Sequence, residues 1–217
     1  MKPLLIDQKQ YVASLDVHAQ NTFTPLCPQE LPVAEGDQIV NALNQQATLA
    51  AKRIGSKEAH HPQALWVADA EHPQLTAVEG DNVDVRWRPH SIVGSEGFNL
   101  ISGLPEIGDY DFFIWQGIEL DMHPYGVCYH DFAEKLSTGI IEYLGLHHIN
   151  TVIIGGLATD YCVKTSTLQL RRAGFNTIVN LAACRGLAEK TTQAALEEMQ
   201  QAGVVLVDNM AAMVNAK

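Results

Sequence analysis

The chain has 217 residues, of which 47% are hydrophobic, and this is enough to build one domain with a complete core. We therefore predict a single domain over residues 1–217. The formal net charge of −11 argues against binding to nucleic acid and to anionic membrane surfaces, because both would repel an acidic protein. A small neutral molecule is the better candidate for a ligand.

Polar residues at positions 7–10 interrupt the first fifteen residues before any long apolar run, so we expect neither a signal peptide nor a membrane span. The four cysteines, at positions 27, 128, 162 and 184, have neither paired nor metal-type spacing. Such cysteines suit a reducing compartment, and we predict a cytoplasmic protein. The sequence leaves the oligomeric state open, with a homo-oligomer among the alternatives.

Apolar runs alternate with helical patterns along the chain, which is typical of parallel strands joined by crossover helices. The sequence therefore predicts an α/β fold with a mostly parallel sheet. Strand patterns occupy residues 11–16, 54–57, 111–115, 151–155, 176–181 and 204–207. Helical patterns occupy residues 36–53, 131–146, 165–173 and 189–201.

A long segment between His60 and Tyr110 is rich in proline, glycine, histidine and acidic residues. Segments of this length without regular structure are usually functional or disordered. Because this one carries two tryptophans and Phe98, we predict an ordered cap over the site at about 60–110.

Four candidate polar groups follow or end predicted strands. They are Asp16, Glu58, Gln116 and the loop before Cys162. Since ligands of open parallel sheets bind at the carboxyl ends of the strands, we expect these groups to converge in one crevice.

Cys162 stands where the strand at 151–155 gives way to a helical pattern, so it lies on the first turn of that helix. The free N–H groups and the dipole at a helix start favour a thiolate, which is a nucleophile. The same N–H groups can hold the oxyanion that forms when a carbonyl is attacked. The alternative is a small buried cysteine with no chemical role.

The stretch around this cysteine resembles the nicotinamidase signature of the isochorismatase-like family of cysteine hydrolases, and the resemblance covers nearly the whole chain. Its most specific part is Gly156-Leu157-Ala158-Thr159-Asp160-Tyr161-Cys162-Val163. The resemblance implies a Rossmann-like three-layer sandwich in which a Cys, an Asp and a Lys act with a divalent metal ion. It also implies an oxyanion site at the N–H groups of Ala158 and Cys162, after a cis peptide bond before Ala158.

Asp16 precedes a segment that resembles the family's Asp-x-Gln-Asn-Asp-Phe pattern with two extra residues before Gln20-Asn21. The resemblance assigns Asp16 as the group that takes the thiol proton and gives it to leaving ammonia, a role that suits a carboxylate beside the sulfur. The alternative is an aspartate that forms a turn after a strand. Phe23, at the end of the segment, would face the ring of the ligand.

The segment Ser56–Pro62 resembles the family's metal-binding Asp-x-His element. In an extended chain, residues two apart project to the same face, so Glu58 and His60 can coordinate one ion. His90 matches the family's Trp-x-x-His element and would supply the third ligand, while His61 competes with His60 for its role. The resemblance implies zinc, iron or manganese as the metal.

Two aromatic residues are candidates for contacts with the substrate ring. Trp87 stands three residues before His90, where the family has an aromatic that stacks on the ring, and Tyr125 follows His123-Pro124. A planar heteroaromatic ligand gains contact area from such walls.

Gln116 occupies the place of the family's catalytic lysine, in Trp115-Gln116-Gly117. A neutral amide donates hydrogen bonds but does not supply the positive charge that would lower the pKa of the cysteine. The sequence therefore predicts slow or absent turnover, unless a cation such as Lys57 compensates.

The resemblance implies an amidohydrolase that converts nicotinamide into nicotinate and ammonia through a thioester at Cys162, in the salvage of NAD. A second hypothesis is a catalytically weak or inactive relative that binds a ligand. A third is a carbamoyl or ureido amidohydrolase of the same fold. The aromatic walls Phe23 and Trp87 argue against the third, because it requires a basic pocket that binds a carboxylate.

Overall fold

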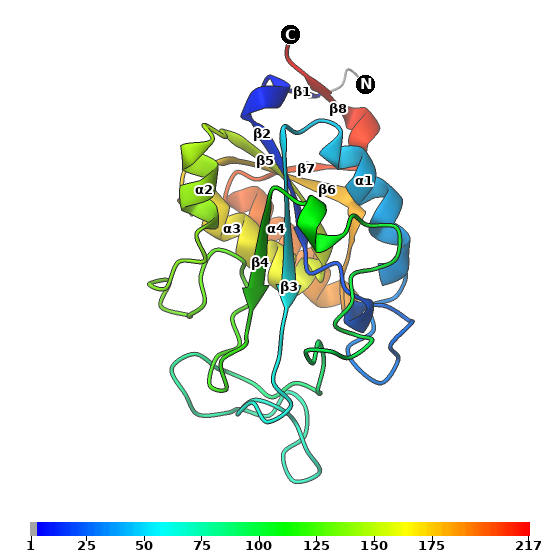
Figure 1. Ribbon diagram of the computed structural model, residues 1–217, viewed down its shortest axis with the longest axis vertical. Helices are drawn as coiled ribbons and strands as arrows, with labels where there is room; N and C mark the ends of the chain where they lie inside the picture. The colour runs from blue at the N-terminus through cyan, green and yellow to red at the C-terminus, as the bar shows by residue number, and fades with distance from the viewer. Residues whose placement is uncertain (1–3) are drawn as a thin grey trace.

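A computed structural model describes residues 4–217 of the chain, so the first three residues of the N-terminal stretch lie outside the described part. Its centre is a sheet of six parallel strands in the order β4-β3-β2-β5-β6-β7 (Figure 1). The order reverses between β2 and β5, and such a reversal is where open parallel sheets bind their ligands. The strands are β2 (Val12–Val17), β3 (Lys52–Glu58), β4 (Phe112–Gln116), β5 (Thr151–Leu157), β6 (Asn176–Arg185) and β7 (Val205–Val207).

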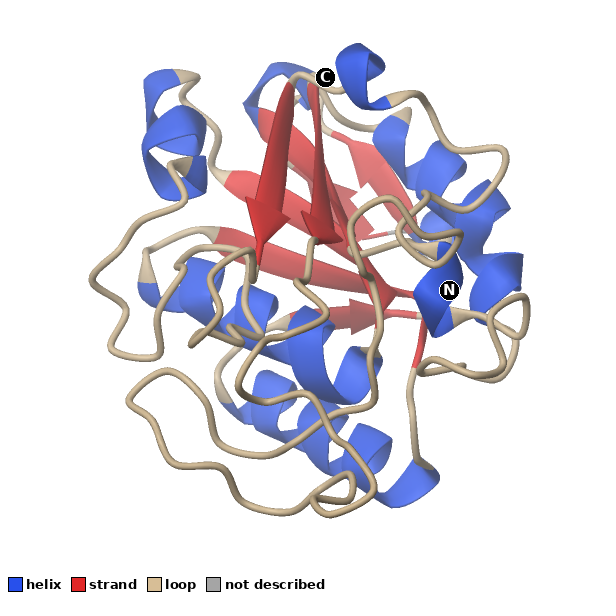
Figure 2. Ribbon diagram, turned by 60° about the horizontal axis from the view of Figure 1, so that its bottom comes forward, coloured by secondary structure: helices blue, strands red, loops and turns tan. Residues whose placement is uncertain are grey.

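Helices cover both faces of this sheet, as Figure 2 shows. One face carries α1 (Val40–Ala47), which packs on β2, β5 and β6. The other face carries α2 (Ile140–Leu146), α3 (Lys164–Arg172) and α4 (Glu189–Gln201). The predicted three-layer α/β sandwich with a mostly parallel sheet is confirmed.

The central strand β5 is buried along its whole length. It pairs with β2 on one side and β6 on the other, and helices cover both of its faces, so none of its positions faces water. Gly156 permits the close approach of β5 to β2, because it has φ 136° and an added Cβ would lie 2.0 Å from the carbonyl oxygen of Val17. This contact fixes the start of the cysteine-bearing segment against β2.

A second, two-stranded parallel sheet joins β1 (Leu4–Ile6) to β8 (Met213–Asn215). The first and last strands of the described residues 4–217 meet there, away from the carboxyl ends of the central strands (Figure 1). The sequence analysis missed these strands, since three residues are too few to show a period. Within residues 4–217, no helix has both the length and the apolarity to cross a membrane.

Two predicted helices are too long. The pattern at 36–53 forms a 3₁₀ turn (Gly36–Ile39) and α1, which ends at Ala47, because Lys52 and Arg53 join the sheet beside β2. The pattern at 131–146 is helical only from Ile140. Its first part is a turn in which the Asp131 carboxylate accepts hydrogen bonds from the N–H groups of Lys135 and Leu136, at 2.9 and 2.8 Å.

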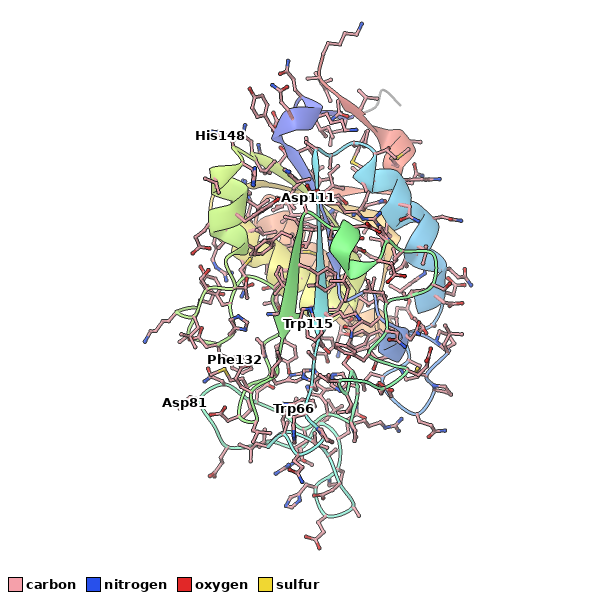
Figure 3. All side chains as sticks on the ribbon, viewed as in Figure 1. Trp66, Asp81, Asp111, Trp115, Phe132 and His148 are labelled. Atoms are coloured by element: carbon pink, nitrogen blue, oxygen red, sulfur yellow. The ribbon has the colours of Figure 1, made fainter. Side chains whose placement is uncertain are left out.

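Most of residues 59–106, named the covering loop below, lies beyond the carboxyl ends of β3 and β4, and its last part returns past α1 to the start of β4 (Figure 1). An isolated β-bridge joins Val67 to Trp87 within it, and Trp66 and Trp87 are buried. Figure 3 places Trp66 in this loop, past the end of β4 that Trp115 marks. The ordered cap and the single domain stay predictions, which this packing supports.

Candidate active site

A cavity lies where the switch point of the sheet meets the covering loop. It brings together most of the predicted site residues, namely Cys162, Glu58, His90, Ala158, Phe23, Trp87 and Tyr125. Four further residues line it that the sequence analysis did not assign: Leu31, His123, Tyr161 and Leu187.

Cys162 lies in a π-helical turn (Thr159–Val163) between β5 and α3, as its place at a helix start predicted. Its thiol donates to Glu58 Oε1 at 3.5 Å, and the backbone N–H of Ala158 lies near the sulfur and favours its thiolate. Burial raises the pKa of the Cys162 thiol well above its usual range, and the negative charge of Glu58 acts in the same direction. The expectation that the helix start favours the thiolate is therefore outweighed, and the attacking sulfur needs a proton acceptor.

Glu58 is the centre of the site, because its two oxygens face different groups. Oε1 lies 3.5 Å from Cys162 Sγ and 3.6 Å from His18 Nδ1. Oε2 lies 3.2 Å from His60 Nε2 and 3.0 Å from His90 Nε2. Burial alone would raise the pKa of Glu58, but the hydrogen bonds and charges of His60 and His90 hold it well below its usual range. The carboxylate is therefore ionised although it is only 2% exposed.

Backbone carbonyls set the orientation of two histidines. His60 Nδ1 donates to Gly117 O at 3.0 Å, and His90 Nδ1 donates to Arg88 O at 2.7 Å. Since a carbonyl oxygen only accepts, each Nδ1 carries a hydrogen, and the Nε2 of each ring faces Glu58. This is the arrangement in which histidines bind a metal ion through Nε2.

His123 is a fourth member of this cluster. Its ring is buried, and neither nitrogen has a hydrogen-bond partner among residues 4–217. One ligand atom from each of Glu58, His60, His90 and His123 lies within 4.8 Å of the others. The unpaired ring nitrogens of His123 are costly to bury unless a cation binds one of them, so this donor set fits a divalent metal ion.

No local sequence pattern marks His123, which follows the end of β4 by seven residues and shares no motif with Glu58 and His60. The one feature of the sequence that could have indicated a role in the site is that His123 lies in the segment that follows the end of β4. His61, the alternative to His60, is exposed, and its Nδ1 accepts a hydrogen bond from the N–H of Gln63 at 3.1 Å. His61 is not part of the cluster.

Asp16 does not reach Cys162, so the role of proton shuttle predicted for it is wrong. Its Oδ2 accepts hydrogen bonds from Arg53 at 2.7 and 2.9 Å and from the Tyr110 hydroxyl at 3.0 Å. The physical reason is that β2 continues through Val17 and the chain turns only at His18, which has φ 42°. In the family's Asp-x-Gln-Asn pattern the Asp stands two residues before the Gln. His18 stands two residues before Gln20, so His18 takes the place of that Asp and the match needs no inserted residues.

Gln116 ends β4 and is 1% exposed. Its Nε2 donates to Gly126 O at 2.6 Å and to Tyr129 O at 3.1 Å, while its Oε1 lies 2.9 Å from His18 Nε2. Lys57 does not line the cavity. Its ammonium lies 4.2 Å from the centre of the Phe98 ring, and burial lowers its pKa, so it does not compensate for the missing lysine.

The predicted aromatic walls line the same cavity. Trp87 Nε1 donates to the Tyr125 hydroxyl at 3.1 Å, and that hydroxyl donates to Asp84 at 2.8 Å. Phe23 lies on the metal-cluster side, with its ring centre 5.8 Å from that of His90. The Leu157–Ala158 peptide bond is cis, as the resemblance implied. The rings define a slot beside Cys162 whose orientation is fixed by hydrogen bonds.

Comparison with known proteins gives concordant matches. The model of the Isochorismatase domain matches residues 128–210. A nicotinamidase of Acinetobacter baylyi is 28% identical over 208 residues, which cover 94% of this chain and 95% of that relative. The solved nicotinamidase/pyrazinamidase of Acinetobacter baumannii superposes with a TM-score of 0.83 at 28% identity and covers 93% of this chain and 97% of its own.

A pyrazinamidase of Pyrococcus horikoshii, solved in complex with zinc, shares the fold with a TM-score of 0.71 at 22% identity, covering 91% of this chain and 98% of its own. In sequence and in fold the chain is therefore similar to nicotinamidases, and residues 128–210 match the Isochorismatase domain.

The position of Asp16 generates a first prediction. Asp16→Asn should lower the free energy of unfolding by about 2–4 kcal/mol, because it leaves the mostly buried Arg53 without its ionic partner. Urea unfolding followed by circular dichroism measures this change. Turnover per folded molecule should stay unchanged. If Asp16→Asn were stable but inactive, Asp16 would have a catalytic role after all.

The histidine cluster generates a second prediction, with His61 as the matched control. His60→Ala should weaken binding of Zn²⁺ by about 10²-fold or more. Removing a residue that only hydrogen-bonds to a metal ligand already lowers metal affinity by about 10- to 100-fold, and removing the ligand itself costs at least as much. His123→Ala should weaken it as well. Competition with a fluorescent chelator and elemental analysis measure both effects. His61→Ala should bind Zn²⁺ like the unmodified protein, and equal losses in His60→Ala and His61→Ala would contradict the assignment.

Proposed function

We propose that the protein hydrolyses the carboxamide of nicotinamide to nicotinate and ammonia through a thioester at Cys162. The observation that carries this proposal is the juxtaposition in one cavity of a buried cysteine, a metal-type cluster and an aromatic slot. The nicotinamidase relatives support the same substrate class.

The chain itself supplies the nucleophile and the oxyanion site. The sulfur of Cys162 attacks the carboxamide carbon, and the carbonyl oxygen becomes an oxyanion. The N–H groups of Ala158 and Cys162 are the proposed donors to that oxygen, since the Ala158 N–H already points at the sulfur. Loss of ammonia leaves the thioester, and water then releases nicotinate and restores the thiol.

The residues that would hold a metal ion are Glu58, His60, His90 and His123. Three imidazoles and one carboxylate favour zinc over manganese, which prefers oxygen ligands, and iron is the second candidate. The zinc in the Pyrococcus horikoshii pyrazinamidase is in accord with this choice. When bound, such an ion supplies positive charge that orients an electron-rich ring nitrogen of the substrate and offsets the charge of Glu58.

The aromatic slot favours a planar ring over the carbamoyl and ureido alternatives. Phe23, Trp87 and Tyr125 offer ring faces and edges, whereas no lysine or arginine is among the residues that line this cavity within the described chain. A substrate that carries a carboxylate would therefore find no basic partner there.

The biological setting is also a proposal. Deamidation of nicotinamide to nicotinate serves the salvage of NAD, and we assign the protein to that role in the cytoplasm. A homo-oligomer stays an open alternative to a monomer.

The nucleophile generates a third prediction. Cys162→Ala should abolish release of ammonia from nicotinamide while the fold is retained, because the change removes one sulfur atom and leaves the turn at Thr159–Val163 intact. A coupled ammonia assay and circular dichroism on the same sample measure both properties. Cys27→Ala is the matched control and should keep full turnover, since Cys27 lies away from the cavity.

Two outcomes would contradict the proposal. Turnover by Cys162→Ala would exclude the thioester. If the unmodified protein loaded with Zn²⁺ binds nicotinamide but releases no ammonia, the protein is the ligand-binding relative.

A further inference from the structure

Thioester formation from a resting thiol requires a group that takes the hydrogen of Cys162. This inference rests on the proposed function and concerns how that proton moves. Asp16 is bound to Arg53 and Tyr110, and the place of the family's lysine holds Gln116. Both expected partners of the cysteine are therefore absent, although the cysteine and its cavity are retained.

His18 lies beside the sulfur instead. A ring nitrogen of His18, a carboxylate oxygen of Glu58 and the sulfur of Cys162 all lie within 4.8 Å of one another. The His18 side chain is 0% exposed, and its Nδ1 has no hydrogen-bond partner among residues 4–217. Nδ1 is the nitrogen that faces this group, at 3.6 Å from Glu58 Oε1. An ordinary buried histidine would have both nitrogens satisfied.

Gln116 determines which nitrogen of His18 carries the hydrogen. Both amide hydrogens of Gln116 are used, because Nε2 donates to the carbonyls of Gly126 and Tyr129. This fixes the orientation of the amide, so Oε1 must be the atom that faces His18 Nε2 at 2.9 Å. Oε1 only accepts, hence Nε2 of His18 carries the hydrogen and Nδ1 presents a lone pair. Gln116 is a positioning residue for this ring.

We propose that Cys162, His18 and Gln116 form a catalytic triad in which His18 Nδ1 is the base and Gln116 orients it. The logic is that of the cysteine proteases, where an amide side chain orients the histidine that activates the sulfur. Here the histidine and the glutamine stand at the positions of the family's aspartate and lysine. Under this proposal Gln116 is part of a working site, and the protein is expected to turn over without the family's lysine.

The proton follows a closed cycle. As the sulfur attacks, the S–H bond breaks, the hydrogen moves to His18 Nδ1, and the sulfur electron pair forms the S–C bond. When the oxyanion collapses, the C–N bond breaks and the imidazolium gives its proton to the nitrogen, which leaves as ammonia. Water then attacks the thioester, its proton moves to Nδ1, and that proton returns to the sulfur as the S–C bond breaks.

Glu58 is the competing base, because its Oε1 accepts the thiol hydrogen at rest. Its other oxygen belongs to the metal-type cluster, and a carboxylate that shares its charge with a cation is a weak base. We therefore assign Glu58 to hold the thiol in place, and His18 to take the proton.

The test is His18→Gln in the metal-loaded protein. The amide of the new side chain places an N–H where His18 Nε2 lies, so the bond to Gln116 is kept, whereas the basic lone pair is lost. We expect kcat for ammonia release to fall by roughly 10²–10⁴-fold, with Zn²⁺ content and affinity for nicotinate unchanged. The alkylation rate of Cys162 by iodoacetamide should also fall. If His18 is only structural, His18→Gln keeps both rates, and this result would overturn the triad.

Gln116→Leu tests the positioning role in two backgrounds. It should lower kcat by about tenfold or more in the unmodified protein but cause no further loss in His18→Gln, because Gln116 acts through His18. Equal losses in both backgrounds would show that Gln116 acts independently of His18.

The alkylation rate separates this inference from the proposed function. If the unmodified protein releases no ammonia, the proposed function fails. Slower alkylation in His18→Gln than in the unmodified protein would still support the base, and an unchanged rate would refute it.

Discussion

The carboxylate of Glu58 is the constraint on which the site depends. A buried, ionised carboxylate is stable only when groups of opposite charge or hydrogen-bond donors surround it. Here Oε2 faces the Nε2 atoms of His60 and His90, and Oε1 faces the thiol of Cys162. One side chain thus joins the candidate metal site to the nucleophile.

The topology of the sheet explains why these groups meet. Glu58 and Gln116 are register partners at the ends of β3 and β4, while His18 and Cys162 follow the two strands on either side of the switch point. Two departures from the family pattern lie side by side. Histidine replaces aspartate where glutamine replaces lysine, and those two side chains are hydrogen-bonded to each other. A coordinated replacement is a better account than the loss of one catalytic residue.

The sequence predicted the parts of the molecule that depend on local pattern. The central strands and α4 were found within a few residues, and the cysteine turn, Glu58-x-His60 and the aromatic walls came from short motifs. The misses have physical causes. Asp131 closes a turn that competes with a helix, and the strands β1 and β8 are too short to show a period. His123 meets its partners only through the tertiary fold. Asp16 ends the strand pattern in the sequence, whereas the turn at His18 decides which residue reaches the sulfur.

The most direct measurement is the rate at which iodoacetamide alkylates Cys162 at pH 7, with and without Zn²⁺. The charge of Glu58 raises the pKa of the Cys162 thiol, and a cation bound at Oε2 offsets that charge. If Glu58 joins the two halves of the site, Zn²⁺ should accelerate alkylation by about tenfold or more, since each unit by which the pKa falls gives about ten times more thiolate. Mass spectrometry of the modified peptide identifies the cysteine. A rate that Zn²⁺ leaves unchanged or lowers would contradict the account.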